Sequence, residues 1–121
     1  MQTTVQQHIE ALQADPNVLG GEEGAMITWC AQQGDLNMVA TLLRAGAAKT
    51  IDRVGGDGAM NALGYAAHRL DLEMIRLLLA WGASIDRTDG DHLTPRERLP
   101  PRTEENAEKV DLALELLSPT S

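Results

Sequence analysis

Residues 71–83, which read DLEMIRLLLAWGA, decide how this chain folds. Apolar side chains recur at offsets 0, 3, 6 and 7, the spacing that places them along one face of a helix: Leu72, Ile75, Leu78 and Leu79. Asp71 can cap the start of this helix, and Gly82 can end it in a left-handed conformation. The stretch therefore predicts an amphipathic helix with both ends marked.

The same phrase occurs earlier, as DLNMVATLLRAGA at residues 35–47. Eight positions match without a gap, and they are Asp35/Asp71, Leu36/Leu72, Met38/Met74, Val39/Ile75, Leu42/Leu78, Leu43/Leu79, Gly46/Gly82 and Ala47/Ala83. A shorter helical segment precedes each copy, at residues 25–33 and 61–69. Two helices joined by one or two residues must fold back on each other, so the chain contains two helix–turn–helix units of one design.

These units resemble the ankyrin repeat. The resemblance rests on features that both units share. Each short helix contains a pair of small residues, Cys30-Ala31 and Ala66-Ala67, and a tight turn follows it at Gly34-Asp35 and at Leu70-Asp71. Each long helix has the form V-x-x-L-L-x-x-G-A and ends in glycine and alanine, with Val39, Leu42-Leu43 and Gly46-Ala47 in the first unit and Ile75, Leu78-Leu79 and Gly82-Ala83 in the second. Neither unit has the family's T-P-L-H opening, and Leu70 stands where a turn glycine is expected. The connector KTIDRVGGDGAM, residues 49–60, is longer than usual and is expected to form a hairpin-like finger.

Weaker units flank the two repeats. Thr3 or Thr4 can cap an N-terminal helix over residues 4–14. A third unit begins at Thr94-Pro95, which matches the T-P opening of the family, but Pro100-Pro101 cuts its first helix short. A helix over 104–117 follows, with the stripe Val110, Leu114 and Leu117. The resemblance implies one all-α solenoid over 1–121. Its parts are an N-terminal capping helix and loop (1–20), repeat 1 (21–53), repeat 2 (54–87) and a degenerate capping repeat (88–121).

The charge of the chain narrows the class of partner. The net charge is −8, and residues 1–43 contain five acidic side chains and no Lys or Arg. This balance argues against binding to nucleic acid or an anionic membrane and favours a basic protein. One cysteine excludes an intrachain disulfide, and no signal sequence or long apolar run is present, so we expect a cytoplasmic location.

No candidate catalytic, cofactor or metal site has the residue positions and spacing that its chemistry requires. Cys30 fills a small-residue position on an inward helix face, so it is expected to be a buried packing thiol. His8, His68 and His92 lack neighbours spaced as zinc ligands. Residues 86–91 with Glu97 misplace the glycine and carboxylates of a calcium loop, and Gly55-Gly56-Asp57-Gly58 lacks the lysine of a phosphate loop. We therefore expect no enzyme activity, no cofactor and no metal.

A partner-binding surface is what the resemblance implies instead. In ankyrin-like proteins partners contact the finger tips and the exposed face of the short helices. By position, the expected residues are Glu22, Glu23, Gln32, Gln33, Asp57, Met60, His68, Arg69, Asp89, Asp91 and His92. Trp81, just before the closing glycine, is either an aromatic anchor for a partner or a residue packed on the third unit. We expect a monomer, with a homodimer through an exposed end of the stack as the alternative.

The hypothesis from the sequence is a protein-binding module without catalysis. Small, acidic, stand-alone ankyrin proteins are similar to bacterial immunity or antidote proteins, which occlude a toxin or enzyme, so a stoichiometric inhibitor of a basic partner is favoured. An adaptor that bridges two proteins is the main alternative, and a small enzyme using Cys30 is a remote one.

Overall fold

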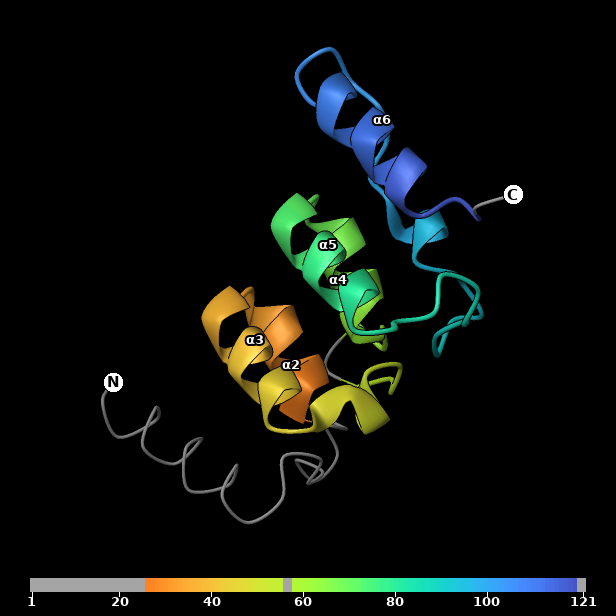
Figure 1. The fold of residues 1–121 in the computed structure, drawn as a ribbon. Helices are drawn as coiled ribbons and strands as arrows, with labels where there is room; N and C mark the ends of the chain where they lie inside the picture. Colours follow the sequence, from red (N-terminus) through yellow and green to blue (C-terminus); the bar gives the residue numbers. More distant parts are fainter. Residues whose placement is uncertain (1–25, 56–57, 120–121) are drawn as a thin grey trace.

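The computed structural model describes residues 26–55 and 58–119; the helix expected over residues 4–14 lies outside these ranges. The helices, in order along the chain, are α2 (Met26–Gln33), α3 (Leu36–Arg44), η2 (Ala47–Thr50), α4 (Ala62–His68), α5 (Leu72–Ala80), η3 (Arg96–Arg98) and α6 (Ala107–Leu116). Figure 1 shows α2 with α3 as one antiparallel pair, α4 with α5 as the next, and α6 stacked beyond them. The prediction of an all-α stack of helix pairs is confirmed.

The predicted helix boundaries follow from local hydrogen bonds. The Asp35 carboxylate accepts from the backbone N–H of Met38 at 3.0 Å, and Asp71 accepts from Met74 at 3.2 Å. These are N-caps at equivalent positions of the two repeats, and each satisfies a donor that the first helical turn leaves free. At the carboxyl end of each long helix, a glycine in the left-handed conformation ends the turn that follows. These glycines are Gly46 after α3, with φ 112°, and Gly82 after α5, with φ 96°.

The turn between short and long helix is the same in both repeats, although its central residue is not. Gly34 occupies this turn in the first repeat with φ 76°, a conformation that glycine adopts without strain. Leu70 occupies it in the second repeat with φ 55°. A residue with a Cβ is strained there, so the surrounding hydrogen bonds, including Asp71 N to Ala66 O at 2.9 Å, hold Leu70 in a conformation it does not favour.

The core is continuous from one repeat to the next. Large side chains of the long helices are fully buried, among them Val39, Leu42, Met74, Ile75 and Leu78. The short helices α2 and α4 pack against each other, and small residues on them have no exposed surface: Ala31, Ala62, Ala66 and Ala67. Neither repeat could bury its apolar face alone, so each is stabilised by the other.

The third unit is shortened, as the prolines predict. Thr94 and Glu97 form a reciprocal capping box, with Thr94 N to Glu97 Oε1 at 3.0 Å, but the helix that follows, η3, lasts only three residues. Helix α6 begins at Ala107 instead of residue 104, because Thr103 and Asn106 bond to each other in a turn. Its inner stripe is Val110, Ala113 and Leu117, with Leu114 half-buried.

Candidate interaction surface

The connector between the repeats is a hairpin-like finger, as expected. The Gly55 N–H donates to the carbonyl of Met60 at 3.0 Å, which makes an isolated antiparallel bridge. Tyr65, on α4, supports the finger from below. Its hydroxyl donates to the carbonyl of Gly55 and accepts from the N–H of Gly58, at 3.0 Å in the second case. The buried phenol therefore has the partners that it requires, and the finger is fixed to the short helix beneath it.

Met60 does not lie on the exposed surface where the sequence predicted it. Its side chain is 7% exposed and belongs to the core cluster. Met60 pairs with Gly55 through its backbone and precedes Asn61, whose side chain caps α4 by accepting from Gly64 N at 2.8 Å. Its side chain packs against the start of α4 as part of the core. The expectation of an exposed Met60 was therefore wrong.

The next loop is organised around a buried carboxylate, Asp89, which is only 6% exposed. Arg98 reaches it from η3, with 2.7 Å between Nε and Oδ2, and also bonds Asp91 at 2.8 Å. The N–H groups of Asp91 and Leu93 donate to Asp89 as well. Burial alone would raise the pKa of Asp89, but the bonds from Arg98, Asp91 and Leu93 hold that pKa below its ordinary value.

Asp89 therefore holds this loop together and is not an exposed contact residue, which corrects a second expectation. A hydrogen bond from Gly90 N to Ala59 O, 2.9 Å long, fixes the loop beside the preceding finger. Two neighbouring residues remain available to a partner: Asp91, whose side chain is 61% exposed, and His92. Arg98, which sequence reasoning missed, is the residue that orders them.

Four other predicted residues gather at the far end of the short helices. Gln33, His68 and Arg69 are exposed there, and Gln32 is half-buried. The Arg69 guanidinium donates to the carbonyl of Gln32 at 3.1 Å. It also covers Gly34 so closely that a side chain at that glycine would displace it. Arg69 thus links the two repeats, in addition to presenting charge at the surface.

Trp81 caps the carboxyl end of α5 and is 41% exposed, so part of its indole is packed and part is open to solvent. Because α4 and α5 are antiparallel, Trp81 lies with the finger and the loop at 88–95, at the opposite end of the pair from Arg69. We call these the finger end and the turn end. The predicted residues therefore form two groups: Asp91, His92 and Trp81 at the finger end, and Gln32, Gln33, His68 and Arg69 at the turn end. Glu22, Glu23 and Asp57 lie outside the described residues.

The buried thiol offers no nucleophile. Cys30 is 1% exposed, and burial, with a smaller contribution from the charge of Asp35, raises its pKa to about 12. At neutral pH the sulfur is therefore protonated and unreactive. Within residues 26–55 and 58–119, no three His, Cys, Asp or Glu side chains are grouped so that they could hold a metal ion. No helix among the same residues is long and apolar enough to cross a membrane.

The stack of helix pairs is similar in structure to solved ankyrin repeat domains. The ankyrin repeat domain of Bcl-3, described as a unique member of the IkappaB protein family, aligns with a TM-score of 0.69 over 94% of this chain and 46% of its own, at 23% identity. The human ASB11 ankyrin repeat domain aligns with a TM-score of 0.61 over 80% of this chain and 40% of its own, also at 23% identity. The chain has the ankyrin-repeat fold.

The resemblance predicted from the sequence is therefore confirmed at the level of fold. This ankyrin-repeat chain spans less than half the length of either domain that it matches. No protein-family model and no curated protein sequence matches it. Its function has to be argued from its own surface.

Proposed function

We propose that this ankyrin-repeat chain is a protein-binding module that inhibits a basic partner by occluding it, without catalysing a reaction. Trp81 carries the proposal. A tryptophan that is 41% exposed and fixed at a helix end is the kind of side chain that dominates binding energy at interfaces. Asp91 and His92 are exposed at the same end of the helices and are the polar residues proposed to contact the same partner.

The choice of a basic partner rests on charge. The chain has a net charge of −8, and its first 43 residues contain five acidic side chains and no Lys or Arg. Such a charge attracts a cationic active site or nucleic-acid groove and accelerates association with it. A toxin or enzyme with a groove of that kind is the partner class that fits best. We place this action in the cytoplasm, because a single unpaired cysteine suits a reducing compartment.

The first experiment is co-purification of the tagged chain from its native cell, followed by a measurement of stoichiometry and of the partner's activity. A one-to-one complex in which the partner is inactive is the expected result. A complex in which the partner keeps full activity would rule out inhibition. Two partners held at once would instead favour the adaptor alternative.

Matched variants then locate the contact. Trp81→Ala should weaken the complex at least ten-fold, because loss of an interface hot spot costs about 2 kcal/mol or more. Leu112→Ala is the control, since Leu112 is also 41% exposed but lies on α6. Equal affinities of the two variants would exclude Trp81 as the anchor.

Charge reversal tests the electrostatic part separately. Glu22→Lys with Glu23→Lys should slow association and flatten its dependence on salt. Glu104→Lys with Glu105→Lys changes the net charge equally at the other end of the chain and should have the smaller effect. If both pairs behave alike, the acidic N-terminal segment is not the contact. Retention of full biological effect by Cys30→Ala would dismiss the remaining enzyme hypothesis.

A further inference from the structure

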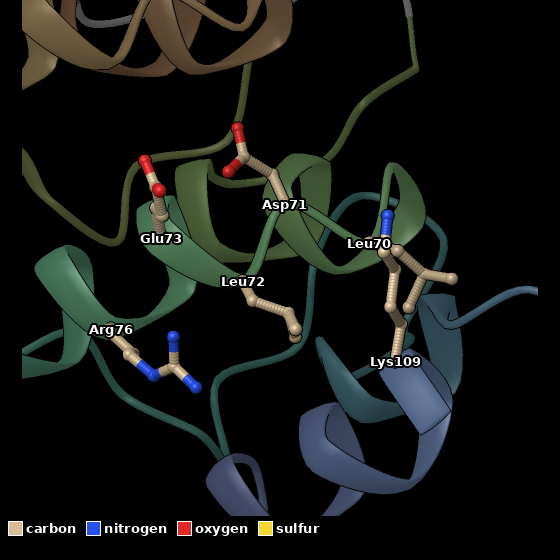
Figure 2. A pocket seen from close by; sticks show the side chains of 6 residues that line it. All are labelled: Leu70, Asp71, Leu72, Glu73, Arg76 and Lys109. Atoms are coloured by element: carbon tan, nitrogen blue, oxygen red, sulfur yellow. The ribbon is translucent and has the colours of Figure 1, made fainter. Parts of the chain in front are cut away.

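A groove of about 340 Å³ opens at the turn end, between the start of α5 and the first turn of α6 (Figure 2). Six residues line it: Leu70, Asp71, Leu72, Glu73, Arg76 and Lys109. The short helix of the third unit, η3, is only three residues long, and the apolar side chains of Leu70 and Leu72 at this end of α5 are only partly covered. The groove lies at the opposite end of the helices from the finger end, where the proposed inhibitory contact is placed.

The apolar floor of the groove is Leu70 and Leu72. Both are half-buried and pack against the core while leaving part of their surface open. In Figure 2 the side chain of Leu72 lies in the middle, and Leu70 lies to one side of it. A floor of this size accommodates one apolar side chain of a ligand.

Two cations border this floor. Arg76 lies on one side of Leu72 in Figure 2, and Lys109, from α6, lies on the other, alongside Leu70. Both residues are exposed, and neither forms an ion pair with another described residue. A carboxylate that approached either cation would therefore not have to displace an existing partner.

The two acidic residues of the groove constrain the ligand further. The Asp71 carboxylate is occupied as the N-cap of α5, and in Figure 2 both Asp71 and Glu73 point away from Leu72. Their charges still disfavour a dense polyanion such as nucleic acid, because the lining as a whole, with two acids and two bases, is neutral. Isolated carboxylates beside an apolar side chain suit the arrangement better.

We propose that this groove binds an extended peptide segment of a second protein, with a leucine-like side chain on Leu72 and carboxylates directed to Arg76 and Lys109. The spacing supports an extended ligand. Arg76 follows Leu72 by one helical turn, which separates their Cβ atoms by about 6 Å. Residues two apart in an extended chain lie about 6.6 Å from each other on the same face. A Glu-x-Leu sequence therefore matches the pair Arg76 and Leu72. A second glutamate, two residues beyond the leucine, continues toward the side of Leu72 on which Lys109 lies in Figure 2.

Such a site would allow the chain to hold an acidic segment at the turn end while a basic partner occupies the finger end. The two contacts involve different residues, so binding at one end can be lost while binding at the other end is kept. Beyond inhibition, the chain would bring a second protein, bound at the turn end, to the first.

Fluorescence anisotropy of the full chain with a labelled Ser-Glu-Ala-Leu-Ala-Glu-Ser peptide tests the site. Saturable binding is expected, and replacing both glutamates of the peptide by glutamine should weaken it about ten-fold, since each exposed ion pair contributes modestly. Replacing the leucine by serine should weaken it as well. No saturable binding, or equal binding of the glutamine peptide, would overturn the proposal.

Paired variants of the chain complete the test. Arg76→Glu with Lys109→Glu should abolish the preference for glutamate, whereas Arg44→Glu with Lys49→Glu should leave affinity within about two-fold. Arg44 and Lys49 are exposed cations at the finger side of α3, so the control changes net charge equally. Circular dichroism melts confirm that both variants are folded. Equal losses in the two variants would show non-specific attraction and overturn the site.

Discussion

Arg69 of the second repeat donates a hydrogen bond to the backbone carbonyl of Gln32 in the first, with 3.1 Å between Nη1 and the oxygen. That carbonyl belongs to the last turn of α2, where no intrahelical donor is available. A side chain of one repeat therefore completes the helix of its neighbour. The contact joins the two repeats at the turn end, where the Arg69 side chain is exposed.

Arg69→Ala should lower the free energy of unfolding by about 1 kcal/mol, because a charge-assisted bond and the packing over Gly34 are lost together. A urea titration measures the effect. Arg96→Ala, which removes an exposed arginine whose side chain forms no hydrogen bond with another described residue, is the control and should leave the midpoint nearly unchanged. A similar loss in both variants would mean that the link to Gln32 contributes nothing.

The left-handed conformation of Leu70 predicts that glycine at this position is more stable than alanine, the reverse of their order within a helix. Its φ of 55° favours glycine over alanine by about 1 kcal/mol, so Leu70→Gly should be the more stable of the pair Leu70→Gly and Leu70→Ala. Both variants lose the leucine side chain, so packing cancels in the comparison. In the middle of α3, where φ is helical, Ala40→Gly should instead destabilise by about 1 kcal/mol. Thermal melts of Leu70→Gly, Leu70→Ala and Ala40→Gly measure these differences in stability.

The Asp89–Arg98 pair predicts how stability depends on pH. The pKa of Asp89 is lowered in the folded chain, so the unfolded chain binds the proton more readily. The stabilisation is therefore present above the unfolded pKa, near 3.9, and is lost as the pH falls through the lower folded value. Asp89→Asn should cost about 1–2 kcal/mol at pH 7 and reduce the loss of stability between pH 5 and pH 2. Urea midpoints across this range would contradict the assignment if the two proteins responded equally.

Leu78 should be among the most costly positions in the core. It has no exposed surface, and Leu78→Ala removes buried apolar atoms and leaves a cavity, for a loss of about 2–5 kcal/mol. Leu112→Ala, at an exposed position of α6, should cost less than about 1 kcal/mol. Calorimetry compares them, and an unchanged melting temperature for Leu78→Ala would remove this residue from the core.

Cys30 should react with a disulfide reagent only after unfolding. With a pKa of about 12, about one molecule in 10⁵ carries the thiolate at pH 7, and the sulfur is 1% exposed. The labelling rate in buffer should therefore be far below the rate in concentrated urea. Rapid stoichiometric labelling of the folded chain would show that the thiol is accessible and would reopen a chemical role for it.

The repeat could be predicted from the sequence because its signals are local. Asp35 and Asp71 cap the helices that follow them, and Gly46 and Gly82 end those helices, through contacts that span only a few residues. The ankyrin-repeat stack then follows from two apolar stripes in the same register. Each of these features depends on residues that are close together in the chain.

The surface was predicted less well because it depends on contacts within loops, which no repeated spacing marks. Met60 pairs with Gly55 across the finger, and Asp89 bonds Arg98, nine residues later in the chain. Neither contact has a periodic signal. The separation of Trp81 from Arg69 could have been predicted, since two helices joined by a tight turn must run in opposite directions.

The two repeats are tied to each other at both ends of their helices. Arg69 bonds Gln32 at the turn end, and at the finger end the N–H of Ser84 donates to the Asp52 carboxylate at 2.9 Å. Two ties at opposite ends resist both bending and twisting between the repeats, which a single tie could not do. A ligand that spans the repeats would thus meet a surface whose shape is set before it arrives, and its binding energy would not be spent on aligning them.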